Sequence, residues 1–171
     1  SSDVCSSDLA EVTGWFTNAA ELRLDLGARG GFHVLDPAGA ELGYLIRTLP
    51  QADRIIGYCG ITDTLVALDR EGRVLGFRIR KSEDTKTHVG DVMADRHFRK
   101  TWNGMTWQEV ADMDLQKAGV EGVSGATKTS LAVAEGIVHR FRAAQGELRP
   151  PPVRVGVRDA GLVVAVAIGA W

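Results

Sequence analysis

Two turn signals, each lying between apolar runs, constrain the fold of this chain more than any other feature. The turns are Asp36-Pro37-Ala38-Gly39 and Asp69-Arg70-Glu71-Gly72, and the apolar runs beside them are 32–35, 42–48, 64–68 and 74–79. Short runs joined by such turns are typical of β-hairpins. Two hairpins in succession predict an antiparallel sheet, which 55–59 could extend. Arg78 and Arg80 alternate with apolar residues, which favours one solvated face.

Apolar residues at helical spacing predict helices that pack on this sheet. The strongest stripe runs from Thr127 to Ala144, and Gly146 is expected to end that helix. Weaker patterns predict helices over 10–28, 83–98 and 106–115. The expected fold class is therefore α+β, an antiparallel sheet built from hairpins and packed with helices, with Trp102 and Trp107 in its core.

Composition and charge argue against nucleic-acid binding, and no residue cluster predicts a metal site. The chain has 171 residues, of which 44% are hydrophobic and 25% charged, and its net charge is −2. This is ordinary for one folded domain and gives no basic footprint for nucleic acid. Cys59 is expected to be a small buried hydrophobe. His88, Asp91 and Asp95 could share a helix face, but such faces are usually solvated, so we predict no metal site.

The segment from Ser124 to Ser130, Ser-Gly-Ala-Thr-Lys-Thr-Ser, is the strongest candidate for a binding site. It opens the longest predicted helix, where unpaired backbone N–H groups and a partial positive charge suit a phosphate. Small residues at Gly125 and Ala126 permit a close approach of the backbone. A purely structural helix cap explains the same residues. A nucleotide-binding P-loop does not, because Thr127 stands where that motif needs its second glycine.

Ser124-Gly125-Ala126-Thr127 followed by a helix resembles the flavinylation motif of FMN-binding domains. These domains occur in NosR/NirI-like regulators of denitrification and in the RnfG and NqrC electron-transport subunits. Glu121 stands where the family usually has Asp. The likeness covers about residues 30–145, and its further motifs are Gly57-Tyr58-Cys59-Gly60, the strand 65–69, Gly72, Gly76-Phe77 and Glu83-Asp84-Thr85. Asp84 interrupts the family's Glu-Thr pair, so Glu83 and Thr85 are not expected to contact flavin.

The resemblance implies an FMN-binding domain fold and FMN joined to Thr127 by a phosphoester. It implies that Ser124, Gly125 and Ala126 shape the turn around the phosphate, which Thr129 and Ser130 would hydrogen-bond. Lys128 either neutralises phosphate charge or is solvated. No catalytic residue is expected, since the domain would transfer electrons rather than act as a stand-alone enzyme. The implied partners are a flavin transferase and membrane redox proteins that carry quinol, haem or iron–sulfur groups.

The ends of the chain suggest three parts. Residues 1–9 look like a sequencing or assembly artefact or a disordered tail, and 10–148 is the expected FMN-binding domain. Residues 149–171, in which three prolines at 150–152 mark a boundary, are expected to be a linker and the truncated start of a transmembrane helix. The uncharged run 160–171 predicts the truncated start of a transmembrane helix, with a β-hairpin of 153–157 and 162–167 as the alternative.

The first functional hypothesis is therefore a membrane-tethered, NosR/NirI-like electron-transfer domain with covalent FMN, on the extracytoplasmic side of the inner membrane. The second is an unflavinylated extracytoplasmic sensor or ligand-binding module of the same fold. A reversible phosphate- or nucleotide-binding domain at the same helix start is a minor third.

Overall fold

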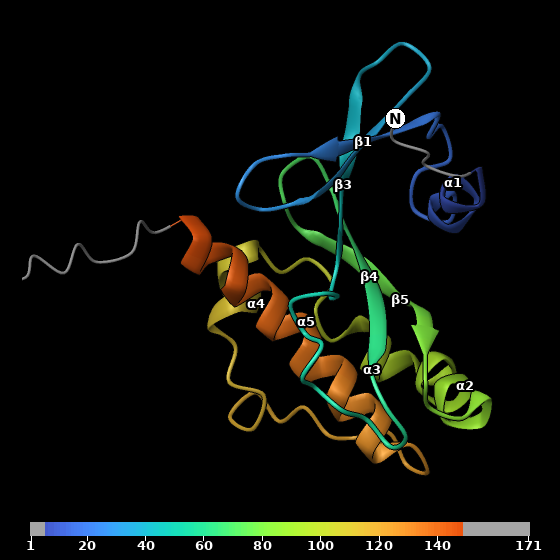
Figure 1. Ribbon diagram of the computed structural model, residues 1–171, viewed down its shortest axis with the longest axis vertical. Helices are drawn as coiled ribbons and strands as arrows, with labels where there is room; N and C mark the ends of the chain where they lie inside the picture. The colour runs from blue at the N-terminus through green and yellow to red at the C-terminus, as the bar shows by residue number, and fades with distance from the viewer. Residues whose placement is uncertain (1–5, 149–171) are drawn as a thin grey trace, which may run out of the picture.

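A five-stranded antiparallel sheet and five helices make up the part of the chain that the computed structural model describes, residues 6–148. The strands follow one another in the sheet in sequence order. They are β1 (Glu21–Asp25), β2 (Gly31–Leu35), β3 (Glu41–Arg47), β4 (Thr62–Leu68) and β5 (Val74–Ser82). The helices are α1 (Ser6–Val12), α2 (Lys86–Ala94), α3 (Arg96–Lys100), α4 (Trp107–Asp112) and α5 (Thr127–Leu148). The α+β prediction is confirmed (Figure 1).

Both predicted hairpins form, and local turn chemistry explains each. At the turn between β2 and β3, the Asp36 carboxylate accepts the N–H groups of Ala38 and Ala40 at 2.9 and 2.8 Å. At the turn between β4 and β5, the Asp69 carboxylate accepts the N–H of Arg73 at 2.8 Å. Aspartate at the start of a turn stabilises it in this way before any tertiary contact forms.

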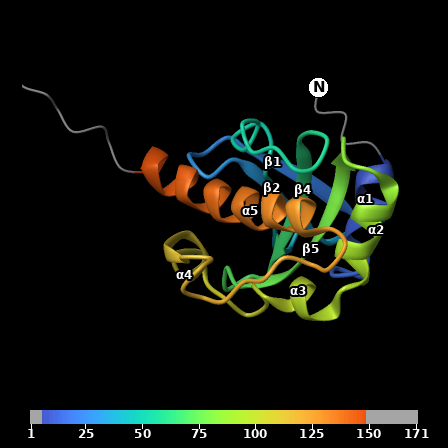
Figure 2. The same ribbon diagram turned by 90° about the horizontal axis from the view of Figure 1, so that it is seen from below.

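Strand β4 lies at the centre of the packing, and all seven of its residues are buried. Val66 and Leu68 belong to the larger core cluster, which α5 covers, whereas Leu65 and Ala67 belong to a second cluster with residues of the N-terminal segment. Figures 1 and 2 show α5 and α1 on opposite sides of the sheet. The sheet thus separates two apolar layers.

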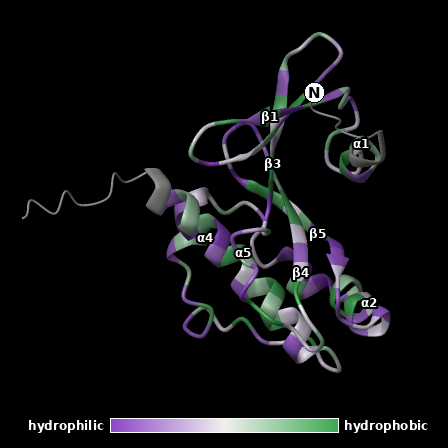
Figure 3. Ribbon diagram, viewed as in Figure 1, coloured by the Kyte–Doolittle hydropathy of each residue, from purple (hydrophilic) through white to green (hydrophobic). Residues whose placement is uncertain are grey.

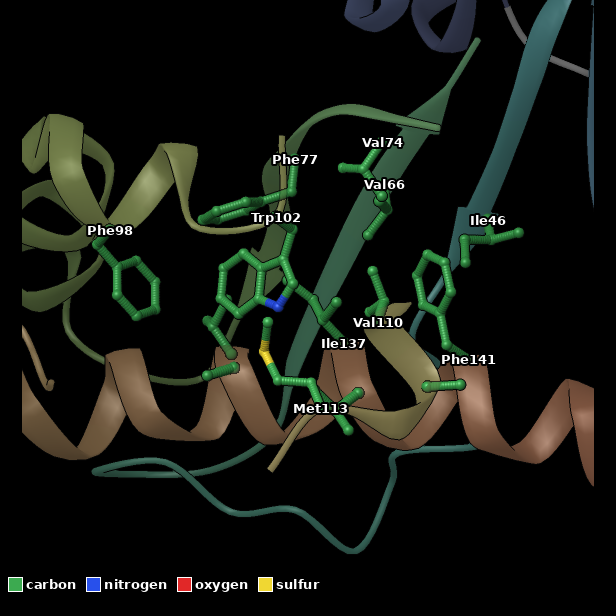
Figure 4. Packing of buried hydrophobic residues seen from close by; sticks show 14 of the residues in the cluster. Ile46, Val66, Val74, Phe77, Phe98, Trp102, Val110, Met113, Ile137 and Phe141 are labelled. Atoms are coloured by element: carbon green, nitrogen blue, oxygen red, sulfur yellow. The ribbon is translucent and has the colours of Figure 1, made fainter. Parts of the chain in front are cut away.

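The larger core lies between α5 and the sheet (Figure 4). Phe77, Phe98 and Trp102 pack edge to face, with ring centroids 5.6 to 6.0 Å apart, a favourable aromatic geometry. Trp107 is half-buried, and its indole N–H donates to the Phe141 carbonyl at 3.1 Å. Both tryptophans therefore serve the core, as predicted. Figure 3 shows hydrophobic and hydrophilic residues alternating along α5, as expected for a helix with one buried face.

The predicted helix over 10–28 is wrong for every residue after Val12. Helix α1 ends at Val12, and 21–25 forms the edge strand β1, in which Leu22 pairs with Val34 and Leu24 with Phe32 of β2. The residue spacing permits a helix, but backbone pairing with β2 requires an extended chain. The predicted helix over 83–98 divides at Asp95, whose extended backbone ends α2 and whose carboxylate caps α3. Helix α4 ends at Asp112, earlier than the predicted residue 115.

Three further expectations are corrected. Helix α5 continues through Gly146 to Leu148. The second face of β5 is partly covered: Arg80 pairs with Glu11 at 2.7 Å and the Arg78 guanidinium lies over the Trp15 ring, because the N-terminal segment packs there. The run 55–59 forms a loop with one bridge between Ile56 and Ile61 rather than a sheet strand.

Residues 6–9, expected to be a tail or an artefact, lie within α1, and 1–5 lie outside the described residues. The interpretation of 149–171 as a linker and transmembrane start, and its hairpin alternative, also lie outside them. Within residues 6–148 no helix combines the length and apolarity needed to cross a membrane.

Candidate functional site

The candidate site lies at the start of α5, which a tight loop positions. The N–H of Val123 donates to the Ser130 hydroxyl at 2.9 Å, and that hydroxyl lies 3.0 Å from both the Ala126 and Thr127 carbonyls. Gly125 has a φ of +82°, a conformation that favours glycine. A Cβ on Gly122 would lie 2.5 Å from the Thr127 side chain. Gly122 and Gly125 therefore allow the chain to turn back onto the helix.

The first turn of α5 has no side-chain cap, unlike three other helices. Thr85, Asp95 and Thr106 each accept a backbone N–H at the starts of α2, α3 and α4. Ala126, which has no side-chain acceptor, precedes α5. Within residues 6–148, no partner accepts the backbone N–H groups of 127–129. No side chain therefore caps the first turn of α5 in the described structure. The backbone N–H groups of 127–129 remain available to an anion.

Thr127 is exposed at this helix end. Its hydroxyl makes one long hydrogen bond, 3.3 Å, to the Val123 carbonyl. A group attached to this oxygen would displace only that weak contact. The neighbouring Lys128 is also exposed and brings a positive charge to the same turn. The chemistry of the donors present, namely backbone N–H groups, a hydroxyl and an ammonium, fits a phosphate.

A pocket of about 340 Å³ opens beside Thr127. Its walls come from the β3–β4 loop, α2 and the start of α5. They are Tyr58, His88, Gly125, Ala126, Thr127, Lys128 and Thr129. Figure 1 shows that loop running along α5 toward its first turn. Segments far apart in sequence thus meet at the residues that the motif predicted.

The Asp84 carboxylate holds the β3–β4 loop beside this pocket. It accepts the backbone N–H groups of Cys59 and Gly60. A Cβ on Gly57 would lie 2.4 Å from Asp84 Oδ2, so the loop wraps closely around the carboxylate. Its N–H groups are consequently engaged by this chain's own side chain and not by a ligand phosphate.

Asp84 is 7% exposed, and burial by itself raises the pKa of its carboxyl. The N–H of Cys59, the Thr129 hydroxyl and the N–H groups of neighbouring loop residues outweigh burial, so the pKa lies below its usual value. The Thr129 hydroxyl faces the carboxylate without the geometry of a regular hydrogen bond. Asp84 is thus charged at neutral pH and lies directly behind the first turn of α5.

The six predicted site residues divide into two groups. Ser124, Gly125 and Thr127 are exposed at the loop and the helix end. Ala126, Thr129 and Ser130 are buried. The structure brings Gly125, Ala126, Thr127 and Thr129 together in one pocket, while Ser124 lines a neighbouring hollow. The Ser130 hydroxyl is engaged within the loop, where it supports the turn.

Sequence reasoning missed Tyr58, His88 and Asp84 as parts of this site. Tyr58 and Asp84 lay within motifs already noted, but no local pattern places either beside Thr127. Thr85 caps α2, and Glu83 accepts the N–H of Ile61 at 3.3 Å, so both have structural partners. Cys59 is exposed, contrary to the expectation that it is buried, because its loop lies on the surface.

The fold and the site together define an α+β domain with an open helix N-terminus beside a pocket. Residues 57–139 match the model of the FMN-binding domain family, in agreement with the resemblance that the motif predicted. The match runs from Gly57 through the pocket residues and into α5. FMN is accordingly the cofactor of the domain. No curated protein matches the chain.

Proposed function

We propose that this chain is an electron-transfer domain that carries FMN covalently, through a phosphoester to the Thr127 hydroxyl. One observation supports this most directly: the first turn of α5 has three backbone N–H groups without partners in the described structure, beside an exposed threonine. In a helix that needed only a cap, a side-chain oxygen would fill this position.

Different residues around Thr127 would bind the phosphate and support the loop that presents the hydroxyl. The N–H groups of 127–129 bind the phosphate oxygens, and Lys128 offsets their charge. Ser130 and Gly125 maintain the loop that presents the hydroxyl. FMN, when bound, supplies one- and two-electron redox chemistry. The ester replaces the hydroxyl hydrogen by the FMN phosphoryl group, so the chain gains the mass of FMN less one water.

The proposal extends to the cellular setting. The uncharged run 160–171 supports tethering to the inner membrane, in a NosR/NirI-like arrangement with the domain on the extracytoplasmic side. A covalent cofactor suits that compartment, where released FMN could not be replaced. A flavin transferase would load the domain, and quinol-, haem- or iron–sulfur-containing membrane proteins would exchange electrons with it.

Co-expression with an active flavin transferase, followed by intact mass measurement, tests the proposal. The chain should gain FMN less water, Thr127→Ala should abolish the gain, and Thr127→Ser should retain it. Thr87→Ala is a matched control, because Thr87 is an exposed threonine on the neighbouring helix α2. No gain, with the transferase active on another substrate, would reject covalent attachment and favour the unflavinylated binding module.

A further inference from the structure

One buried polar atom in the pocket beside Thr127 is left for a ligand. The Thr129 hydroxyl, on a residue only 1% exposed, makes no regular hydrogen bond but faces the Asp84 carboxylate, whose pKa it lowers. His88 Nδ1, which also belongs to a residue of this pocket, has no hydrogen-bond partner in the described structure. Because an unsatisfied buried polar atom is costly, its place in a pocket points to a ligand with a polar atom of its own.

The outer wall of the same pocket is aromatic. Tyr58 and His88 meet edge to face, with ring centroids 4.7 Å apart and an interplanar angle of 84°. Tyr58 is 56% exposed, one of the few large apolar side chains on the described surface. It lies on the loop that Asp84 fixes through Cys59 and Gly60. A held, exposed aromatic ring beside a pocket suits a planar aromatic ligand.

A second hollow borders the motif on its other side. It measures about 570 Å³, and its walls include His97, Lys100 and Ser124. Thr127 is not part of its wall, and none of its wall residues has a buried polar atom without a partner. Although this hollow is larger, the unpaired donors and the attachment oxygen both belong to the smaller pocket.

We infer that the pocket of Tyr58 and His88 receives the isoalloxazine ring of FMN, with His88 Nδ1 hydrogen-bonded to the ring's polar edge. This inference rests on the proposed function, because the phosphate at Thr127 determines where the ring can reach. The isoalloxazine edge carries both carbonyl acceptors and an N–H donor, so either tautomer of His88 finds a partner. The flat face of the isoalloxazine ring could pack against the exposed ring of Tyr58, which contacts His88 edge to face.

Flavin fluorescence and visible circular dichroism of the loaded full chain test the inference. A docked ring next to tyrosine should be quenched and should show an induced dichroic band. Tyr58→Leu should raise the fluorescence severalfold and weaken the band, whereas Tyr58→Phe should retain both. His88→Leu should shift the flavin absorption bands. His97→Leu, a histidine change in the other hollow, should alter none of these signals.

Unmodified chain titrated with free FMN separates this inference from covalent attachment. Tyr58→Leu should weaken binding roughly fivefold, equivalent to about 1 kcal/mol for an aromatic pair. If no mass is gained but FMN binding depends on Tyr58, covalent attachment fails and the ring site stands. If His97→Leu weakens binding and Tyr58→Leu does not, the ring occupies the other hollow. If neither variant changes the signals or the binding, the ring has no docked position and the inference is overturned.

Discussion

Replacing Asp84 should separate the two things that its carboxylate provides, hydrogen-bond acceptance and charge. Asp84→Asn retains an oxygen that can accept the N–H groups of Cys59 and Gly60. Its amide nitrogen would replace Oδ2 and could donate to the Thr129 hydroxyl. Asp84→Ala removes both functions and leaves the loop's N–H groups without an acceptor. The alanine variant should therefore be much less stable than the asparagine variant.

The magnitude follows from the bonds involved. Hydrogen bonds to charged groups contribute about 1.5–3 kcal/mol each, and two bonds to one oxygen do not add fully. We therefore expect Asp84→Ala to lower the free energy of unfolding by about 3 kcal/mol. Charge assistance roughly doubles such a bond, so Asp84→Asn should cost about 1 kcal/mol. At about 3 °C per kcal/mol for a chain of this size, Tm should fall by about 9 °C and about 3 °C.

The pH dependence gives an independent test, because the pKa of Asp84 is lowered in the folded protein. The unfolded chain then binds a proton more readily than the folded one. The stabilisation by the charge is present above the ordinary pKa of 3.8 and is lost as pH falls toward the lower folded pKa. The advantage of the wild type over Asp84→Asn should accordingly shrink between pH 5 and pH 3.

Urea denaturation at pH 7, 5 and 3 measures these differences directly. Asp53→Asn is the control, since Asp53 is exposed and makes no side-chain hydrogen bond in the described structure, so it should stay within about 0.5 kcal/mol of wild type. If Asp84→Asn destabilised as much as Asp84→Ala at pH 7, or if its cost did not change with pH, the assignment of separate bonding and charge contributions would be wrong.

Three other substitutions test the core, a cap and the motif loop, each by urea denaturation. Ile137→Ala, at a fully buried position, should cost about 3 kcal/mol through the cavity it leaves, whereas Leu26→Ala, at 89% exposure, should change stability by less than about 0.5 kcal/mol. Thr106→Ala should cost about 1 kcal/mol by removing the capping box of α4, and an unchanged stability would contradict that role. Ser130→Ala should cost about 2 kcal/mol, because it leaves the buried N–H of Val123 without an acceptor.

The parts of the fold that sequence predicted correctly are those that local chemistry determines. The hairpins depend on Asp36 and Asp69, whose carboxylates bond backbone groups two to four residues away. Helix α5 depends on an apolar stripe within a single segment. Strand β1 cannot be predicted from its own residues, because its conformation depends on pairing with β2 and no residue within 21–25 indicates that partner.

In the candidate site, too, only the features determined by neighbouring residues could be predicted from the sequence. The motif around Thr127 could be recognised because its residues are consecutive and begin a helix. The absence of a cap could not be predicted, since Ser124 and Thr127 both have side chains capable of capping. Tyr58 and His88 reach the pocket only through the folding of the β3–β4 loop and α2 around α5. Their meeting is a property of tertiary packing.

Both faces of β4 are buried. The segment that matches the family model is therefore shorter than the segment that packs together as one unit. The family match begins at Gly57, yet Leu65 and Ala67 pack against Val12, Phe16 and Leu45, which precede it. A fragment of residues 57–139 would turn a central strand into an edge strand with an uncovered apolar face. Such edges invite pairing between molecules and aggregation. Any dissection of this protein should therefore keep residues 6–148 together, even where only the flavin site is of interest.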